Sequence, residues 1–290
     1  MSDSVTEAEG DPVRRDDVLG RPSVYRSDLL AGQSVLVSGG GSGIGQGIAL
    51  QLAELGARVV ICGRRLELLE ETRELLASVG GECAIRPTNI REPEQVDALF
   101  EWIESDFGGL DALVNNAGGQ YPQHSMDLSD KGWRAVIDTN LNGSWTMMQR
   151  AARAWRRREA AGSIVSIIAP YVRGMYGLAH TVASRAGVAY LSRNVAVEWA
   201  PLGIRVNCVM PGGIRTKGLE VYDESVRAEM AEAHPLRRLG EVQDIAEAVV
   251  YLIAPSGNFI TGEVIAVDGG HQVHGDLWQA GRPEGWGEGS

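Results

Sequence analysis

A glycine-rich loop follows the first apolar segment of the chain, Val35 to Val37. In Ser38-Gly39-Gly40-Gly41-Ser42-Gly43-Ile44-Gly45, three of the glycines have the spacing G-x-x-x-G-x-G. A strand, a glycine turn and a helix N-terminus together make an anion site, because glycine lets the backbone approach a pyrophosphate and the helix start offers free N–H groups. Glycine turns are common, so the residues after the other predicted strands decide what this loop binds.

Two arginines follow the second predicted strand. The apolar run from Val59 to Cys62 ends in Gly63-Arg64-Arg65, with no acidic residue at its end to bind a ribose 2′-hydroxyl. Guanidinium groups match a 2′-phosphate in charge and geometry. We therefore expect NADP(H) as the cofactor rather than NAD(H). The alternative is that Arg64 and Arg65 only begin a solvated helix.

Polar residues and glycines follow three further predicted strands. In an open α/β sheet, ligands bind at the carboxyl ends of the strands, so these residues are expected to line one site. The amide of Asn89 suits an adenine edge. The three strand-end sequences are Thr88-Asn89-Ile90, Asn115-Asn116-Ala117-Gly118 and Pro211-Gly212-Gly213-Ile214-Arg215-Thr216.

Strands and helices alternate along the chain without a linker. Strands are predicted over 33–38, 59–62, 83–88, 110–114, 163–168, 205–209 and 263–267, and helices over 43–55, 66–78, 93–107, 129–155, 179–200 and 241–253. This alternation predicts the α/β class, with a single-domain doubly wound parallel sheet (Rossmann fold) over residues 31–270. Residues 1–30 are interpreted as a polar extension, 211–240 as a loop-rich insertion and 271–290 as a tail.

The bulk composition narrows the classes of partner. The 290 residues carry a net charge of −11, which disfavours nucleic acid and anionic membranes, and no apolar run is long enough to span a bilayer. The cysteines Cys62, Cys83 and Cys208 fall in predicted strands, so we expect free thiols in a reducing compartment, the cytoplasm. His271-x-x-His274 lies in a glycine-rich tail, and no metal site is expected.

The motifs together resemble the short-chain dehydrogenase/reductase family over about residues 30–270. The matching segments, in order, are Ser38-Gly-x-x-x-Gly-Ile-Gly45, Asn115-Asn-Ala-Gly118, Asn140, Pro211-Gly212 with Ile214 and Thr216, and Asp268-Gly-Gly270. The resemblance implies a nicotinamide cofactor and a homotetramer. With the strand-end reading, it gives as cofactor-binding residues Ser38, Gly39, Gly41, Ser42, Gly43, Ile44, Arg64, Arg65, Asn89, Ile90, Asn116, Ala117, Gly118, Arg185, Pro211, Gly212, Ile214 and Thr216.

The usual catalytic set of that family, Asn, Ser, Tyr and Lys, is mostly missing. Asn140 is present, but Thr181 and Arg185 stand in the tyrosine and lysine positions, and the serine position falls on Ile168. Arg185 keeps a positive charge and can bind ribose hydroxyls, yet it cannot shuttle protons because its ordinary pKa is above about 12.

Three residues are candidates to supply a proton instead. Tyr171 follows the fifth predicted strand, Tyr176 lies five residues further on, and His180 stands beside the vacant tyrosine position. Imidazole titrates near neutral pH, so His180 suits acid catalysis. The structural alternatives are a tyrosine that only lines a pocket and a histidine bonded to the backbone at a helix start.

An activated double bond would not need the usual tyrosine. When hydride adds to the β-carbon of an α,β-unsaturated thioester, charge moves to the thioester oxygen, where hydrogen-bond donors stabilise it. The segments Ile167-Ile-Ala-Pro170, His180-x-x-Ala-Ser-Arg-Ala-Gly-Val188 and Phe259-Ile-Thr-Gly262 resemble the trans-2-enoyl-CoA and 2,4-dienoyl-CoA reductase branch. The expected function is therefore NADP(H)-dependent reduction of a trans-2-enoyl-CoA. The alternatives are a carbonyl or alcohol oxidoreductase, such as one acting on a terpenoid alcohol or aldehyde, and a nucleotide-binding member without catalysis.

The insertion and the tail carry two further expectations. By analogy with the family, residues 211–240 form a mobile substrate lid. Its basic residues Arg215, Lys217, Arg237 and Arg238 suit the phosphates of coenzyme A, or else belong to a solvated loop. Trp278 and Trp286 in the tail are expected to pack against another subunit.

Overall fold

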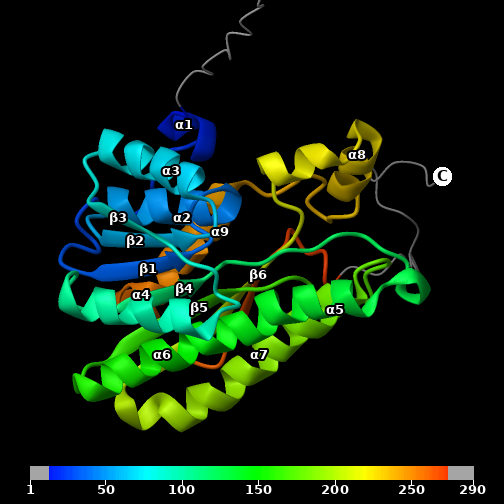
Figure 1. Cartoon of the computed structure of the whole chain (residues 1–290). Coiled ribbons are helices and arrows are strands. Elements are labelled where there is room, and N and C mark those ends of the chain that lie inside the picture. The colour runs from blue at the N-terminus through cyan, green and yellow to red at the C-terminus, as the bar shows by residue number, and fades with distance from the viewer. Residues whose placement is uncertain (1–12, 274–290) are drawn as a thin grey trace, which may run out of the picture.

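A computed structural model describes residues 13–273, and a seven-stranded parallel sheet forms its middle layer (Figure 1). The strand order is β3-β2-β1-β4-β5-β6-β7. Successive strands are added from β1 toward one edge of the sheet as far as β3, and from β4 toward the other edge, which confirms the predicted doubly wound sheet. The strands are β1 (Ser34–Ser38), β2 (Arg58–Gly63), β3 (Cys83–Pro87), β4 (Ala112–Asn115), β5 (Gly162–Ile167), β6 (Ile204–Pro211) and β7 (Val264–Val267).

Helices cover both faces of the sheet. On one face lie α1 (Arg15–Val18), α2 (Gly43–Glu54), α3 (Leu66–Ser78) and α9 (Val242–Ile253), and on the other α4 (Pro93–Ser105), α5 (Asp130–Ile137), α6 (Ser144–Arg157) and α7 (Ala179–Trp199). The predicted bounds of the helices before residue 110 and of α7 and α9 agree with these within a few residues. Helix α8 (Glu224–Glu232) lies in the 211–240 insertion, away from the sheet layers (Figure 1).

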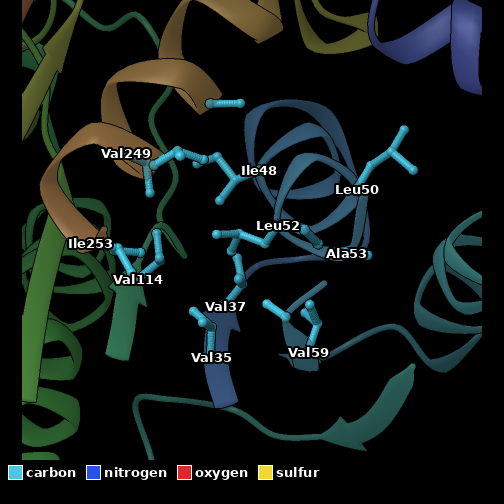
Figure 2. Close-up of a cluster of buried hydrophobic side chains, with 14 of the residues drawn as sticks. Val35, Val37, Ile48, Leu50, Leu52, Ala53, Val59, Val114, Val249 and Ile253 are labelled. Carbon is cyan, nitrogen blue, oxygen red and sulfur yellow. The ribbon is translucent and has the colours of Figure 1, made fainter. Parts of the chain in front are cut away.

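The strands alternate their side chains between two cores. Val35 and Val37 of β1 pack with Ile48 of α2 and Val249 of α9, as Figure 2 shows, while Leu36 faces the cluster formed with α4, α6 and α7. Because both faces are covered, the central strands are buried throughout, as continuous apolar runs predict. The core therefore fixes the carboxyl ends of β1 and β4 next to each other.

The single long helix predicted over 129–155 is interrupted. A π-helical segment, Asp138–Gly143, joins α5 to α6 and carries the buried Asn140. A π-turn holds one residue more than an α-turn and is found often at functional sites. Within this segment, the Asn140 side chain bonds Gly119 in the turn that follows β4.

The described part of the predicted N-terminal extension packs on its own domain. Leu19 and Leu30 are fully buried in the core cluster that contains α2 and α9. The guanidinium of Arg21 contacts Asp244 at 3.0 Å and Glu247 at 2.8 Å, both on α9. Residues 13–30 therefore form a strap, which we call the N-terminal strap, across α2 and α9.

Candidate active site

The glycine loop is closely packed against the end of β4. A Cβ atom on Gly39 would lie 2.9 Å from the Cα of Ala117, and one on Gly45 would collide with the Gly39 carbonyl. Gly39 and Gly43 adopt φ angles of 67° and 55°, which side-chain-bearing residues rarely adopt. The Ser42 side chain does not cap α2, so the first N–H groups of the helix are available to a ligand. This backbone fits a pyrophosphate.

Ser38 and Asn116 join the glycine loop to β4. The Ser38 hydroxyl accepts the N–H groups of Asn116 and Ala117, both at 3.1 Å. In return, the Asn116 side chain donates to the carbonyls of Ser38 and Gly39, also at 3.1 Å. These reciprocal bonds position the loop, which leaves the direct contact of the two side chains with a cofactor as a prediction.

The residues expected around the adenosine differ in availability. Arg64 and Arg65 are exposed at the end of β2, and neither forms an ion pair within residues 13–273. The Asn89 side chain accepts the Arg91 N–H at 3.3 Å and donates to Glu92 at 3.4 Å. The Ile90 side chain is buried in the core, so only its backbone can face a ligand.

Asn140 clamps the turn that follows β4. Its Oδ1 accepts the Gly119 N–H at 2.9 Å, and its Nδ2 donates to the Gly119 carbonyl at 3.0 Å and to the Ser184 hydroxyl at 3.3 Å. Ser184 lies on α7 and itself donates to the Thr181 carbonyl. Asn140 therefore links the π-segment, the β4 turn and α7 in one hydrogen-bonded network.

Arg185 brings a buried positive charge to the same turn. Its guanidinium lies against Gly118, where a Cβ atom would collide with Nη2. Nη1 has no hydrogen-bond partner, and no carboxylate among the described residues pairs with the group. Burial lowers the pKa of Arg185 to about 10, which leaves it charged at neutral pH. An uncompensated charge in this position favours an oxygen-rich or anionic ligand.

His180 lies beside Thr181 at the start of α7, and both are buried. Nδ1 of His180 accepts the Thr181 N–H at 2.8 Å, so in the neutral ring the hydrogen is on Nε2, which has no partner at normal hydrogen-bond geometry. Burial lowers the pKa of His180, partly opposed by the Leu178 carbonyl. The Tyr121 ring covers the imidazole edge-on, with centroids 4.9 Å apart.

The two other candidate proton donors form no hydrogen bond to this network within residues 13–273. Tyr171 is half-buried against the cluster that contains Ile168 and Val188. Tyr176 is 87% exposed and contacts the ring of His124. The structure thus brings together Asn140, His180 and Arg185, but not Tyr176.

The segment after β6 returns to the start of α2. Thr216 lies 3.7 Å from the position that a Cβ atom of Gly43 would occupy. Ile214 is buried in the core, so its side chain is directed away from the site. His234, which the sequence placed only within the insertion, contacts this segment, because its Nε2 accepts the Gly213 N–H at 2.9 Å. No sequence pattern marks that histidine.

The basic residues of the insertion are largely paired within the chain. Arg215 contacts Glu241 at 3.1 Å, and Arg238 contacts Asp244 at 3.3 Å. Arg237 donates to the Glu232 carbonyl, which leaves Lys217 as the exposed basic group without an ion pair in the described part. Ion pairing makes these arginines less available to coenzyme A phosphates.

Three other expectations concern cysteines, metal and membrane. The cysteines are unpaired, with Cys62 and Cys208 buried and Cys83 half-buried. Within residues 13–273, no group of three or more metal-ligating side chains is placed to hold an ion, and His274 lies outside the described residues. The described helices also include none long and apolar enough to cross a membrane. Trp278 and Trp286 lie outside the described range.

Comparison with known proteins places the chain among nicotinamide-dependent oxidoreductases. Residues 39–272 match the family model described as enoyl-(acyl carrier protein) reductase. A probable 2,4-dienoyl-CoA reductase of Bacillus subtilis (strain 168) is 37% identical over 83% of this chain and 97% of that protein. A cyclohexanol dehydrogenase of Acinetobacter sp. (strain SE19) is 36% identical over 81% of this chain and 93% of that protein.

Solved structures agree with these relatives. A citronellol catabolism dehydrogenase of Pseudomonas aeruginosa PAO1 has a TM-score of 0.77 and 37% identity over 86% of this chain and 99% of that chain. A short-chain type dehydrogenase/reductase from Mycobacterium marinum has a TM-score of 0.81 and 32% identity over 84% and 98%. With the fold, the glycine loop and the family model in agreement, the chain belongs to the short-chain dehydrogenase/reductase family.

Proposed function

We propose that the protein is an NADP(H)-dependent reductase of an activated carbon–carbon double bond, with enoyl-CoA or dienoyl-CoA thioesters as the favoured substrate class. The observation that carries this proposal is the buried guanidinium of Arg185, which has an unpartnered Nη1 and no carboxylate among the described residues. Thr181 stands where a proton-donating tyrosine is usual. Together, Thr181 and Arg185 therefore supply positive charge to the site rather than a phenolic proton.

The chemistry follows from where charge develops. When bound, the cofactor supplies a hydride to the β-carbon of the substrate, and the electron pair of the double bond moves toward the thioester oxygen. Arg185 and the Nε2–H of His180 are donors that lower the energy of an oxygen gaining negative charge. Asn140 holds the Gly119 turn against which the substrate would lie. The α-carbon then takes a proton from Tyr171 or water, or from His180 when its ring is protonated to the imidazolium, which burial disfavours.

NADP(H) is the proposed form of the cofactor. Arg64 and Arg65 support it, because both are exposed at the end of β2 with no ion pair in the described part of the chain. The crowded glycines and the uncapped start of α2 fit the pyrophosphate. NAD(H) remains the less favoured alternative.

A carbonyl or alcohol oxidoreductase is the second candidate. It is supported by relatives with names of that kind, among them the cyclohexanol dehydrogenase, and by the position of His180 beside Thr181, because imidazole is a common proton-transfer group. A member that binds nucleotide without catalysis is the third. For all three we propose a homotetramer in the cytoplasm, where reducing conditions suit the unpaired thiols, without nucleic-acid or membrane partners.

A substrate panel tests the proposal. Purified protein is supplied with NADPH and then with crotonyl-CoA, a longer enoyl-CoA, a dienoyl-CoA, or a set of aldehydes and ketones, and the loss of NADPH absorbance is followed. Turnover with thioesters alone supports the proposal, and turnover with carbonyl compounds alone refutes it in favour of the second candidate. NADPH binding without turnover on any of them supports the third.

A further inference from the structure

His234 fills the space between two turns that follow different strands. It lies two residues after α8 and is 4% exposed. A Cβ atom on Gly212, after β6, would lie 2.6 Å from its Nε2, and one on Gly269, after β7, would lie 3.5 Å from its Cβ. The ring also contacts that of His271, with centroids 5.0 Å apart. The imidazole is therefore held from several sides.

Both ring nitrogens of His234 are used, and they require one tautomer. Nδ1 lies 2.6 Å from the Met230 carbonyl of α8, and Nε2 accepts the Gly213 N–H at 2.9 Å. A carbonyl only accepts and an amide N–H only donates, so the hydrogen must be on Nδ1 and Nε2 must be unprotonated. One side chain thus bonds helix α8 to the glycine turn after β6.

We infer that His234 is a positioning residue that links α8 to the Gly212–Gly213 turn. The inference deepens the proposed function and rests on it, because that function requires a bound nicotinamide cofactor and the family resemblance gives Pro211, Gly212, Ile214 and Thr216 as residues that bind it. Through His234, an ordered segment 211–216 stabilises α8, and an ordered α8 stabilises segment 211–216. Such linkage is reciprocal for binding free energies. Order in α8 and occupation of the cofactor site are therefore coupled.

Three substitutions of His234 test its hydrogen bonds to Met230 and to Gly213 one at a time and together. His234→Gln keeps an acceptor at the position of Nε2 and loses the bond to Met230. His234→Asn keeps a donor at the position of Nδ1 and loses the bond to Gly213. His234→Phe keeps a ring and loses both. Leu236→Ala is the matched control, because this side chain lies in the same loop and is 64% exposed.

Two measurements test the link without any substrate. Amide hydrogen exchange reports the order of α8 and of residues 212–216, and titration gives the NADPH dissociation constant. In the unchanged protein, NADPH should slow exchange in peptides covering 212–216 and α8. In His234→Phe the slowing should disappear from α8, and the NADPH dissociation constant should rise about tenfold, the effect of one lost hydrogen bond. Because the link needs both bonds, NADPH should also fail to slow exchange of α8 in His234→Gln and in His234→Asn. The affinity should stay within about threefold in His234→Gln, which keeps the Gly213 bond, and should fall about tenfold in His234→Asn, which loses it.

Two results would overturn the inference. One is wild-type exchange in α8 together with NADPH affinity within about twofold in all three variants. The other is a loss of α8 protection and of NADPH affinity that is equal in all three variants and follows only their lowered unfolding temperature, as a general packing role predicts. If His234→Phe loosens both peptides while NADPH protects neither in the unchanged protein, the link between α8 and Gly213 stands. The assignment of Pro211, Gly212, Ile214 and Thr216 to the cofactor site then fails.

Discussion

Replacing Arg185 by methionine should make the ligand-free protein more stable, although it removes a residue of the candidate active site. Burial lowers the pKa of Arg185 to about 10. The ordinary value is above about 12, and a lowering of this size corresponds to roughly 3 kcal/mol of unfavourable free energy for the charged form. Methionine keeps most of the aliphatic volume and removes the charge. We expect a gain of about 1–3 kcal/mol, since lost contacts with Gly118 offset part of the relief.

Urea unfolding of the cofactor-stripped protein measures this gain. The transition midpoint should rise without a change in slope, and NADPH should stabilise the variant less than the unchanged protein. Arg205→Met is the matched control, because that half-buried guanidinium donates to the carbonyls of Leu252 at 2.8 Å and Gly257 at 2.7 Å. Its loss leaves acceptors unsatisfied and should destabilise by about 1–3 kcal/mol. If Arg185→Met unfolds at lower urea than the unchanged protein without ligand, the guanidinium is not an uncompensated charge and the reasoning is refuted.

Other parts of the structure give further predictions. Arg64→Asp should raise the dissociation constant of NADPH at least about tenfold and favour NAD, because a carboxylate repels the 2′-phosphate; unchanged NADPH affinity would remove Arg64 from the site. Burial raises the pKa of Cys62 and Cys83 to about 12 and that of Cys208 to about 11, so iodoacetamide should label the native protein only as it unfolds, and rapid labelling at about pH 8 would contradict this. Because burial lowers the pKa of His180, the unfolded state binds more protons than the folded state below about pH 6.5, and stability should fall there as pH decreases. Unfolding free energies measured against pH should fall less steeply for His180→Asn, and an equal slope would show that His180 does not contribute.

Local patterns sufficed for the sheet and for the prediction that the candidate site residues lie along one edge of it. The apolar runs and glycine turns identify each strand and its carboxyl end, and the doubly wound order then brings the glycine loop, Asn116 and the segment after β6 together. Arg185 was identified by its place in a family motif. Periodicity could not show which of these polar groups are hydrogen-bonded to each other instead of to a ligand, as Ser38 and Asn116 are.

The features that the sequence did not predict depend on contacts between distant residues or on local departures from regular geometry. A π-segment holds one extra residue in an apolar pattern that otherwise reads as one helix, so the interruption near Asn140 has no signal in the pattern. Ile90 and Ile214 follow strand ends like ligand-binding residues, yet their side chains turn into the core. His234 gains its partners only when the insertion folds back on Gly213.

The N-terminal strap has a consequence for the order in which the protein forms during synthesis. Arg21 and its partners Asp244 and Glu247 are 223 and 226 residues apart in sequence. At about 5–20 residues per second, roughly 10–45 s pass on the ribosome between the appearance of the strap and that of α9. Through that interval Leu19 and Leu30 lack the α9 side of their binding surface, so the strap is made long before it can reach its native contacts. The strap of a nascent chain is therefore expected to need protection by chaperones until α9 has emerged.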